Sequence, residues 1–158
     1  MQSTIKSLTN LAALAVLVSP AASAAPQATP YGAGCAGLQV GSAGAPLAGS
    51  ASFQVTLTGG APSAPAVLII GASDAVWSGF PLPLDLTATG APGCQLLASL
   101  DLTQGLATDA GGAAAQPLPL PCSPNLVGKT LFLQFAVLTP SKKRLRRTRG
   151  STLPRTPG

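Results

Sequence analysis

The chain has 158 residues, with 9 Lys or Arg and 4 Asp or Glu, which gives a formal net charge of +5, and it has no His. Without an imidazole base, a Ser-His-Asp or Cys-His catalytic arrangement cannot be built, and the commonest transition-metal ligand is missing. All four acidic residues are Asp, and nothing in their spacing suggests the paired carboxylates of glycoside hydrolysis. We therefore expect no enzymatic activity and no cofactor.

The first 24 residues have the pattern of a secretory signal peptide. Lys6 supplies a positive charge, residues 8–18 form an apolar region, and Ala22, Ser23 and Ala24 form a small-residue cleavage site. The apolar region has about half of the roughly 20 residues that a membrane-spanning helix needs. Cleavage after Ala24 would leave no transmembrane segment. We expect export through the general secretory route to the medium or the cell surface.

Between residues 25 and 140, short apolar runs alternate with Gly and Pro turns, which is typical of an all-β sandwich or barrel. Residues 51–58 put alternate apolar side chains on one face, which predicts a half-buried strand. Residues 66–70 are continuously apolar, which predicts a central strand covered on both faces. Residues 81–87 alternate again, and because their two prolines lack N–H donors we expect a strand that lies at an edge or directs those positions away from the ladder.

Further strands are expected in the second half of the chain. In residues 94–102 every second side chain is apolar, residues 116–121 repeat a Pro-Leu alternation, and residues 130–139 place Leu and Phe side chains on one face. Residues 123–128 predict one helical turn, because Ser123 can cap it and Pro124 suits the first helical position.

These runs predict an all-β fold, a single small β-sandwich of about seven to eight strands that is jelly-roll or immunoglobulin-like. The sandwich would span residues 35–140, after a flexible N-terminal segment at residues 25–34. Aromatic residues make up only 4% of the chain, so we expect a thin core that a disulfide would help to stabilise.

Most of the positive charge lies in the last 18 residues, which contain seven of the nine basic side chains, whereas residues 25–141 have only Lys129 against four Asp. The body is mildly acidic, so we expect no nucleic-acid binding by the domain. We interpret residues 141–158 as a disordered basic tail, because Leu145 and Leu153 cannot offset an ordering entropy of about 1 to 2 kcal/mol per residue. A reading-frame change in the gene would produce such a tail. The alternative is a functional arm that binds an anionic membrane or nucleic acid.

The three cysteines are Cys35, Cys94 and Cys122, and an exported protein can form disulfides. We favour a structural Cys35–Cys94 disulfide, which would tie the N-terminal segment to the sheet and contribute about 3 to 5 kcal/mol in the chain-entropy model. Cys122 is then free or pairs between chains, although its pairing with either of the others stays open. Separations of 59 and 28 residues do not match short zinc-ligand spacings, so no metal site is expected.

Trp77 is the only tryptophan and our candidate ligand contact. With Phe80 and Tyr31 it could form a platform on which a sugar stacks, although an isolated Trp more often caps the end of a sandwich core. The partner that this reading implies is a polysaccharide. An extracellular protein is the other partner class that we consider.

Four segments together resemble a family of uncharacterised exported bacterial proteins, in which the module often stands at the C-terminus of larger extracellular chains. They are Tyr31-Gly32-Ala33-Gly34-Cys35, Pro65-Ala66-Val67-Leu68-Ile69-Ile70-Gly71, Gly79-Phe80-Pro81-Leu82-Pro83-Leu84-Asp85-Leu86 and Gly90-Ala91-Pro92-Gly93-Cys94. The resemblance covers residues 31–140 and implies a β-sandwich, two cysteines matching Cys35 and Cys94, and no established catalytic residues. The chain departs from the family at Cys122, and after Pro140, where the family continues with a small and polar final strand.

The sequence therefore predicts a secreted, non-enzymatic β-sandwich module with a structural or interaction role in an extracellular or cell-surface setting. The alternative function is a carbohydrate-binding module that uses the region around Trp77.

Overall fold

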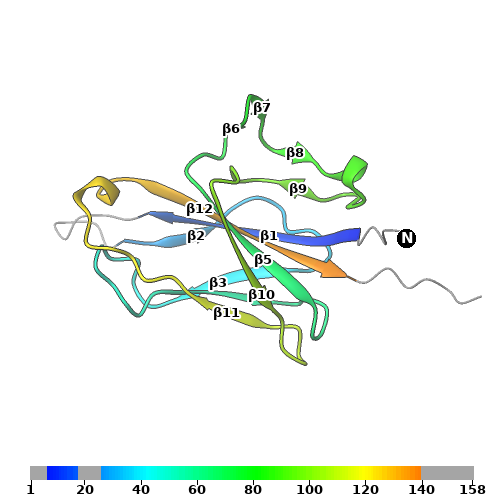
Figure 1. Cartoon of the computed structure of the whole chain (residues 1–158), viewed down its shortest axis with the longest axis horizontal. Helices are drawn as coiled ribbons and strands as arrows, with labels where there is room; N and C mark the ends of the chain where they lie inside the picture. The colour runs from blue at the N-terminus through cyan, green and yellow to red at the C-terminus, as the bar shows by residue number, and fades with distance from the viewer. Residues whose placement is uncertain (1–6, 18–25, 140–158) are drawn as a thin grey trace, which may run out of the picture.

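The computed structural model describes residues 7–17 and 26–139, which fold into strands, turns and two short 3-10 helices (Figure 1). The predicted all-β fold is confirmed. None of the helices in these two ranges has the length and apolarity that crossing a membrane requires. The predicted cleavage site at residues 22–24 and the basic tail at residues 141–158 lie outside the described residues.

A five-stranded antiparallel sheet forms the centre of the molecule. Its strands are ordered β10-β5-β12-β1-β2, and every neighbouring pair is antiparallel. The strands are β1 (Ser7–Leu17), β2 (Ala28–Pro30), β5 (Pro65–Gly71), β10 (Leu102–Ala107) and β12 (Thr130–Thr139).

A three-stranded sheet with the order β11-β4-β3 packs on one face of the five-stranded sheet. Its strands are β3 (Gln39–Ala43), β4 (Gln54–Thr58) and β11 (Ala114–Pro117). The core between the two sheets consists of fully buried apolar side chains, among them Leu14, Val16, Phe53, Val55, Leu57, Leu68, Leu133, Phe135 and Val137. This is the sandwich that the sequence predicted.

Two small hairpins cover the other face of the five-stranded sheet and form an outer layer. The first joins β6 (Val76–Trp77) to β7 (Phe80–Pro81), and the second joins β8 (Leu84–Asp85) to β9 (Gln95–Leu96), with the 3-10 helix η1 (Thr87–Thr89) between them. Leu96 and Ala98 pack there against Ile69 of β5. Figure 1 shows these hairpins on the opposite side of β5 and β12 from β3 and β11.

Several strand predictions are confirmed. Residues 51–58 contain β4, in which Val55 and Leu57 are buried and alternate with partly exposed residues. Residues 66–70 lie in β5, and that strand is covered on both faces because Leu68 enters the main core while Ile69 enters the outer layer. Residues 130–139 form β12 as expected.

The predicted single strand at residues 81–87 is wrong. The chain forms the end of β7, then β8, then η1, and the backbone N–H of Leu82 donates to the carbonyl of Ala75, which continues the β6–β7 hairpin by one residue pair. The prolines at 81 and 83 explain the interruption, because neither residue has an N–H to donate to a continuous strand.

The prediction that residues 94–102 share one face is also wrong. Within residues 94–101, only Gln95–Leu96 form a strand, and Leu97 is buried although it directly follows the buried Leu96. Leu102 belongs to a different strand, β10, and 59% of its surface is exposed. The described residues contain twelve strands instead of seven or eight, because the outer layer adds four strands of two residues each.

Two shorter predicted elements agree closely with the structure. Residues 116–121 overlap β11, which begins two residues earlier at Ala114. The turn expected at residues 123–128 contains the 3-10 helix η2 (Pro124–Leu126), which begins with Pro124 although Ser123 makes no capping hydrogen bond with its side chain.

The N-terminal segments take part in the sheet. Residues 7–17, which include most of the apolar region of the predicted signal peptide, form β1 between β12 and β2. Within residues 25–34, the segment expected to be flexible, Ala28–Pro30 form β2 and pair with β1. Export and cleavage remain predictions.

We predict that Phe135→Ala lowers the free energy of unfolding by about 3 to 5 kcal/mol, because it leaves a cavity in the core. Phe80→Ala is the matched control, since Phe135 is 0% exposed and Phe80 is 57% exposed. It should change stability by less than about 0.5 kcal/mol. Urea unfolding followed by circular dichroism measures both, and equal effects would contradict the described core.

Candidate functional site

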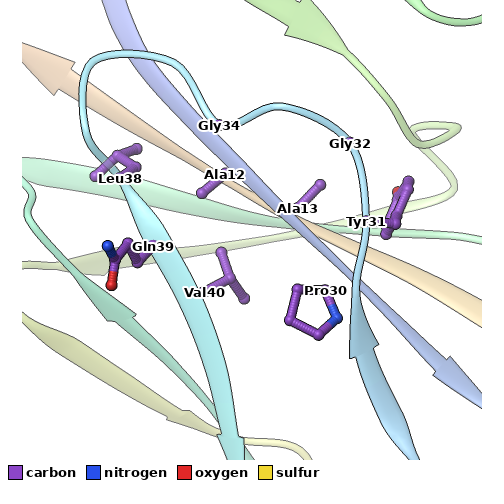
Figure 2. A pocket seen from close by; sticks show the side chains of 9 residues that line it. All are labelled: Ala12, Ala13, Pro30, Tyr31, Gly32, Gly34, Leu38, Gln39 and Val40. Atoms are coloured by element: carbon purple, nitrogen blue, oxygen red, sulfur yellow. The ribbon is translucent and has the colours of Figure 1, made fainter.

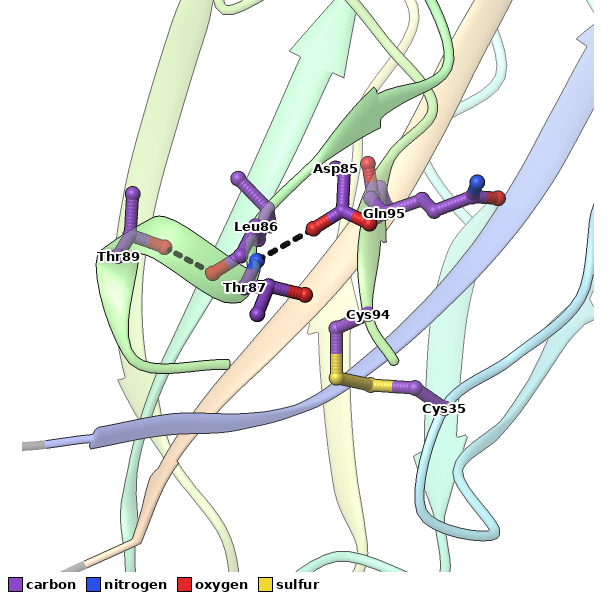
Figure 3. Close-up of a disulfide and its surroundings, with 8 residues drawn as sticks. Cys35, Asp85, Leu86, Thr87, Thr89, Cys94 and Gln95 are labelled. Carbon is purple, nitrogen blue, oxygen red and sulfur yellow. Dashed lines mark hydrogen bonds between the residues drawn. A yellow bond between two sulfur atoms is a disulfide. The ribbon is translucent and has the colours of Figure 1, made fainter. Parts of the chain in front are cut away.

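The outer layer is joined to the N-terminal part of the chain by a disulfide. The predicted bridge between Cys35 and Cys94 is present, and Cys122 is exposed and outside any disulfide. Figure 3 shows Cys94 just before β9 and Cys35 on the loop that precedes β3. The two cysteines form one buried cluster with Ala91 and with Ala136 of β12.

A buried amide connects the outer layer to β12. Gln134 is 0% exposed, its Oε1 accepts the backbone N–H of Leu97 at 2.8 Å, and its Nε2 donates to the carbonyl of Gln95 at 2.8 Å. A buried amide without partners would destabilise the fold, so these two bonds are what allow a polar side chain at this depth. They fix the end of β9 over the centre of the five-stranded sheet.

A second polar cluster fixes the C-terminal end of β5. The Ser99 hydroxyl donates to the Asp101 carboxylate at 2.7 Å, and the same carboxylate accepts the backbone N–H of Ala72 at 2.7 Å. The hydrogen bond from Ser99, followed by that from Ala72, holds the pKa of the Asp101 carboxyl below its usual value. A side chain at position 71 would collide with the backbone carbonyl of Ser99. The close approach of the end of β5 to the segment around Ser99 therefore requires glycine at this position.

Between the outer layer and the sheet lies an apolar cavity of about 340 Å³, which we name the Trp77 groove. Its floor comes from the outward face of the large sheet and its walls from the two hairpins. Apolar side chains account for eight of its ten lining residues, which are Val67, Ile69, Trp77, Leu84, Leu86, Thr89, Leu96, Leu100, Thr103 and Ala136. Such an opening can hold an apolar group and offers few polar partners to it.

Exposed apolar side chains stand beside this groove. Trp77 is half-buried and lies directly across the hairpin from Phe80, which is 57% exposed, while Val76 is 50% exposed. The structure therefore brings Trp77 and Phe80 together, as a ligand-contacting region would require.

Tyr31, the third member of the predicted platform, lies in a different place. Its ring packs edge-on against Phe132 with the ring centroids 5.5 Å apart, and its hydroxyl donates to the carbonyl of Leu97 at 3.3 Å. Burial raises the pKa of the Tyr31 hydroxyl above its usual value, and the Asp74 carboxylate adds to the rise. Tyr31 thus packs as a structural side chain and lines a separate cavity.

That second cavity has a volume of about 290 Å³ and lies beside β1. Figure 2 shows its lining: Ala12 and Ala13 of β1, the segment from Pro30 to Gly34, and Leu38, Gln39 and Val40 around the start of β3. The small alanine side chains leave this space open.

Asp85 and Asp109, like Asp101, accept hydrogen bonds from nearby backbone N–H groups. Oδ1 of Asp109 accepts the N–H groups of Gly111 and Ala113, both at 2.8 Å, and Oδ1 of Asp85 accepts that of Thr87 at 2.6 Å (Figure 3). These are the turn roles that Asp commonly fills. Within residues 7–17 and 26–139, no group of three or more Cys or Asp residues could hold a metal ion.

Sequence reasoning missed the outer layer and therefore the groove. A signal was present in β12, where Phe132, Gln134 and Ala136 occupy the positions that face away from the main core. A strand with one solvent-exposed face usually places polar residues at all such positions, so two apolar residues out of three indicate a covered face.

No protein-family model, curated protein or solved structure matches the chain. The interpretation of the site therefore depends on its own residues.

We predict that Cys94→Ser lowers the free energy of unfolding by about 2 to 5 kcal/mol, because it releases the loop closed by the bridge. Cys122→Ser is the matched control, since Cys122 is exposed and outside the bridge, and its effect should stay below about 0.5 kcal/mol. Denaturant unfolding under oxidising conditions measures the difference. Equal stability of the two variants would contradict the structural role of the disulfide.

Proposed function

We propose that the protein is an exported, non-enzymatic β-sandwich module that binds an apolar side chain of an extracellular protein in the Trp77 groove. The observation that carries this proposal is the groove itself, an opening of about 340 Å³ whose lining is predominantly apolar. Apolar pockets flanked by exposed aromatic side chains are typical anchors of protein recognition.

The exposed surface beside the groove supports a protein partner. Val76 and Phe80 present large apolar side chains to solvent on the hairpin that carries Trp77. Burying such exposed apolar side chains on association is favourable by about 25 cal/mol per Å² before the costs of ordering are subtracted.

The residue inventory supports a binding role over catalysis. The chain has neither His nor Glu, so no imidazole or Glu carboxylate is present to act as a general base. The carboxylates of Asp85, Asp101 and Asp109 each accept hydrogen bonds from nearby groups of the chain. No carboxylate or thiol lines the Trp77 groove, and of its two side-chain hydroxyls, those of Thr89 and Thr103, the hydroxyl of Thr89 donates to the backbone carbonyl of Leu86.

The second candidate is a carbohydrate-binding module, favoured by the neighbouring aromatic rings of Trp77 and Phe80. Sugar recognition combines stacking on an aromatic ring with several polar partners for the hydroxyl groups. Thr89 and Thr103 supply the only polar side chains of the groove lining, which favours an apolar partner group over a sugar.

We predict that the fluorescent probe 1-anilinonaphthalene-8-sulfonate binds in the groove and quenches the fluorescence of Trp77 by energy transfer. Leu84→Asp should weaken probe binding by about tenfold, because it places a carboxylate in the apolar lining. Leu102→Asp is the matched control, since Leu102 is 59% exposed and does not line the groove. Equal probe affinity for both variants would contradict an accessible apolar groove.

We also predict that the protein migrates unretarded through native gels that contain soluble polysaccharides, because the groove offers sugars few polar partners. Trp77→Ala distinguishes specific from non-specific retention. Retardation of the natural chain that is abolished by Trp77→Ala would replace the proposed function with the carbohydrate-binding alternative.

A further inference from the structure

β1 occupies an interior position of the five-stranded sheet. It is registered against β12 from the pair Ser7–Thr139 to the pair Leu17–Thr130, and β2 pairs with its other edge. Leu14 and Val16 are 1% and 0% exposed and belong to the main core. The sandwich therefore uses this segment both for backbone pairing and for core packing.

The same residues form most of the apolar region of the predicted signal peptide, at residues 8–18. Cleavage after Ala24 would remove β1 and leave β2 in the mature chain. β12 would then present one unpaired edge, and the core would lose Leu14 and Val16. An unpaired edge above an apolar opening is a template for pairing with another strand.

We propose that the mature protein has an open strand position between β12 and β2, and that an extended apolar segment of another exported polypeptide fills it. This segment would run antiparallel to β12, as β1 does. Backbone hydrogen bonds to β12 would supply affinity, and alternate side chains entering the core would supply specificity. The inference shares with the proposed function only the premise of export, because this position and the Trp77 groove are different surfaces.

The chain's own residues beyond Thr139 cannot fill this position in the same way. An antiparallel hairpin after β12 would lead into it, but residues 142–149 contain six Lys or Arg and one large apolar side chain, Leu145. Alternate residues of that run would place positive charges in the core, which is strongly unfavourable. In a second copy, the apolar runs of residues 53–57, 66–70 and 131–137 are already part of its own core. A different polypeptide is therefore the better occupant.

The opening also indicates which side chains the partner segment carries. Opposite Phe135 and Leu133 of β12, β1 places Ala12 and Leu14. The cavity of about 290 Å³ beside Ala12 and Ala13 shows that β1 does not fill the space, with Leu38 and Val40 on its far wall (Figure 2). A segment with a larger apolar residue at the position of Ala12 would fit better, because filling a void restores lost contacts.

The test uses the exported, processed protein, with its new N-terminus verified by sequencing, and a fluorescein-labelled peptide of residues 7–17. The processed protein should bind this peptide, and the peptide change Ala12→Leu should tighten binding by about threefold or more. Leu14→Asp in the peptide should weaken binding by about 100-fold. Leu17→Asp is the matched control, because Leu17 is 47% exposed, and it should change binding by less than about threefold.

Two further measurements keep the inference testable. Full-length protein in which Ala24→Leu blocks cleavage should not bind the peptide, because its own β1 fills the position. If the processed chain does not fold alone, refolding with the peptide should restore cooperative unfolding, and the Leu14→Asp peptide should not.

Three outcomes would overturn the inference. The first is a folded processed protein that binds no peptide, the second is refolding that is the same with and without peptide, and the third is an exported chain that keeps residues 7–17. A processed protein that forms a stable dimer and excludes the peptide would assign the position to a second copy instead. Probe binding in the Trp77 groove is measured on the full-length protein with Ala24→Leu, which keeps β1, so the two proposals fail separately.

Discussion

The structure depends on β12, a strand that is buried on both faces and holds three layers together. Its inward side chains Leu133, Phe135 and Val137 enter the core between the two sheets. On the other face, the buried amide of Gln134 binds the backbone on both sides of Leu96. Hydrophobic packing alone is non-directional, whereas these two hydrogen bonds fix where the outer layer lies on the sheet. The Trp77 groove exists because the hairpins are held at that position.

The two surfaces to which we assign binding roles both follow from the construction around β12. On its outward face, the disulfide and Gln134 hold the hairpins above the sheet and leave an apolar opening between them. Along its edge, β12 requires a neighbouring strand, and the described structure supplies Ser7–Leu17. That segment also carries the export signal that the sequence predicts, so one stretch of chain has two roles that cleavage would separate. The proposed function, binding to other chains, would use both surfaces and needs no catalytic residue.

Sequence reasoning found the parts of the fold that depend on regular alternation. Residues 51–58 and 130–139 showed the two-residue period of strands, and the continuous run at 66–70 indicated a strand covered on both faces. It failed at residues 81–102, because the short hairpins there are positioned by individual hydrogen bonds to Ser73, Ala75 and Gln134, two of them from residues distant in the sequence, that leave no periodic pattern. Cys35 and Cys94 were paired correctly, whereas the position of Tyr31 depended on tertiary contacts with Phe132 and Leu97 that no local pattern contains.

The most direct test of this account is amide hydrogen exchange at Leu97 in the variant Gln134→Leu, which keeps the side-chain volume but removes the acceptor of the Leu97 N–H. The account predicts that the Leu97 amide exchanges at least about tenfold faster in the variant, because its buried hydrogen bond is lost and the outer layer opens more often. The amides of β5, which lie in the sheet beneath, should exchange as slowly as in the natural chain. Unchanged protection of Leu97 would contradict the claim that β12 holds the outer layer through Gln134.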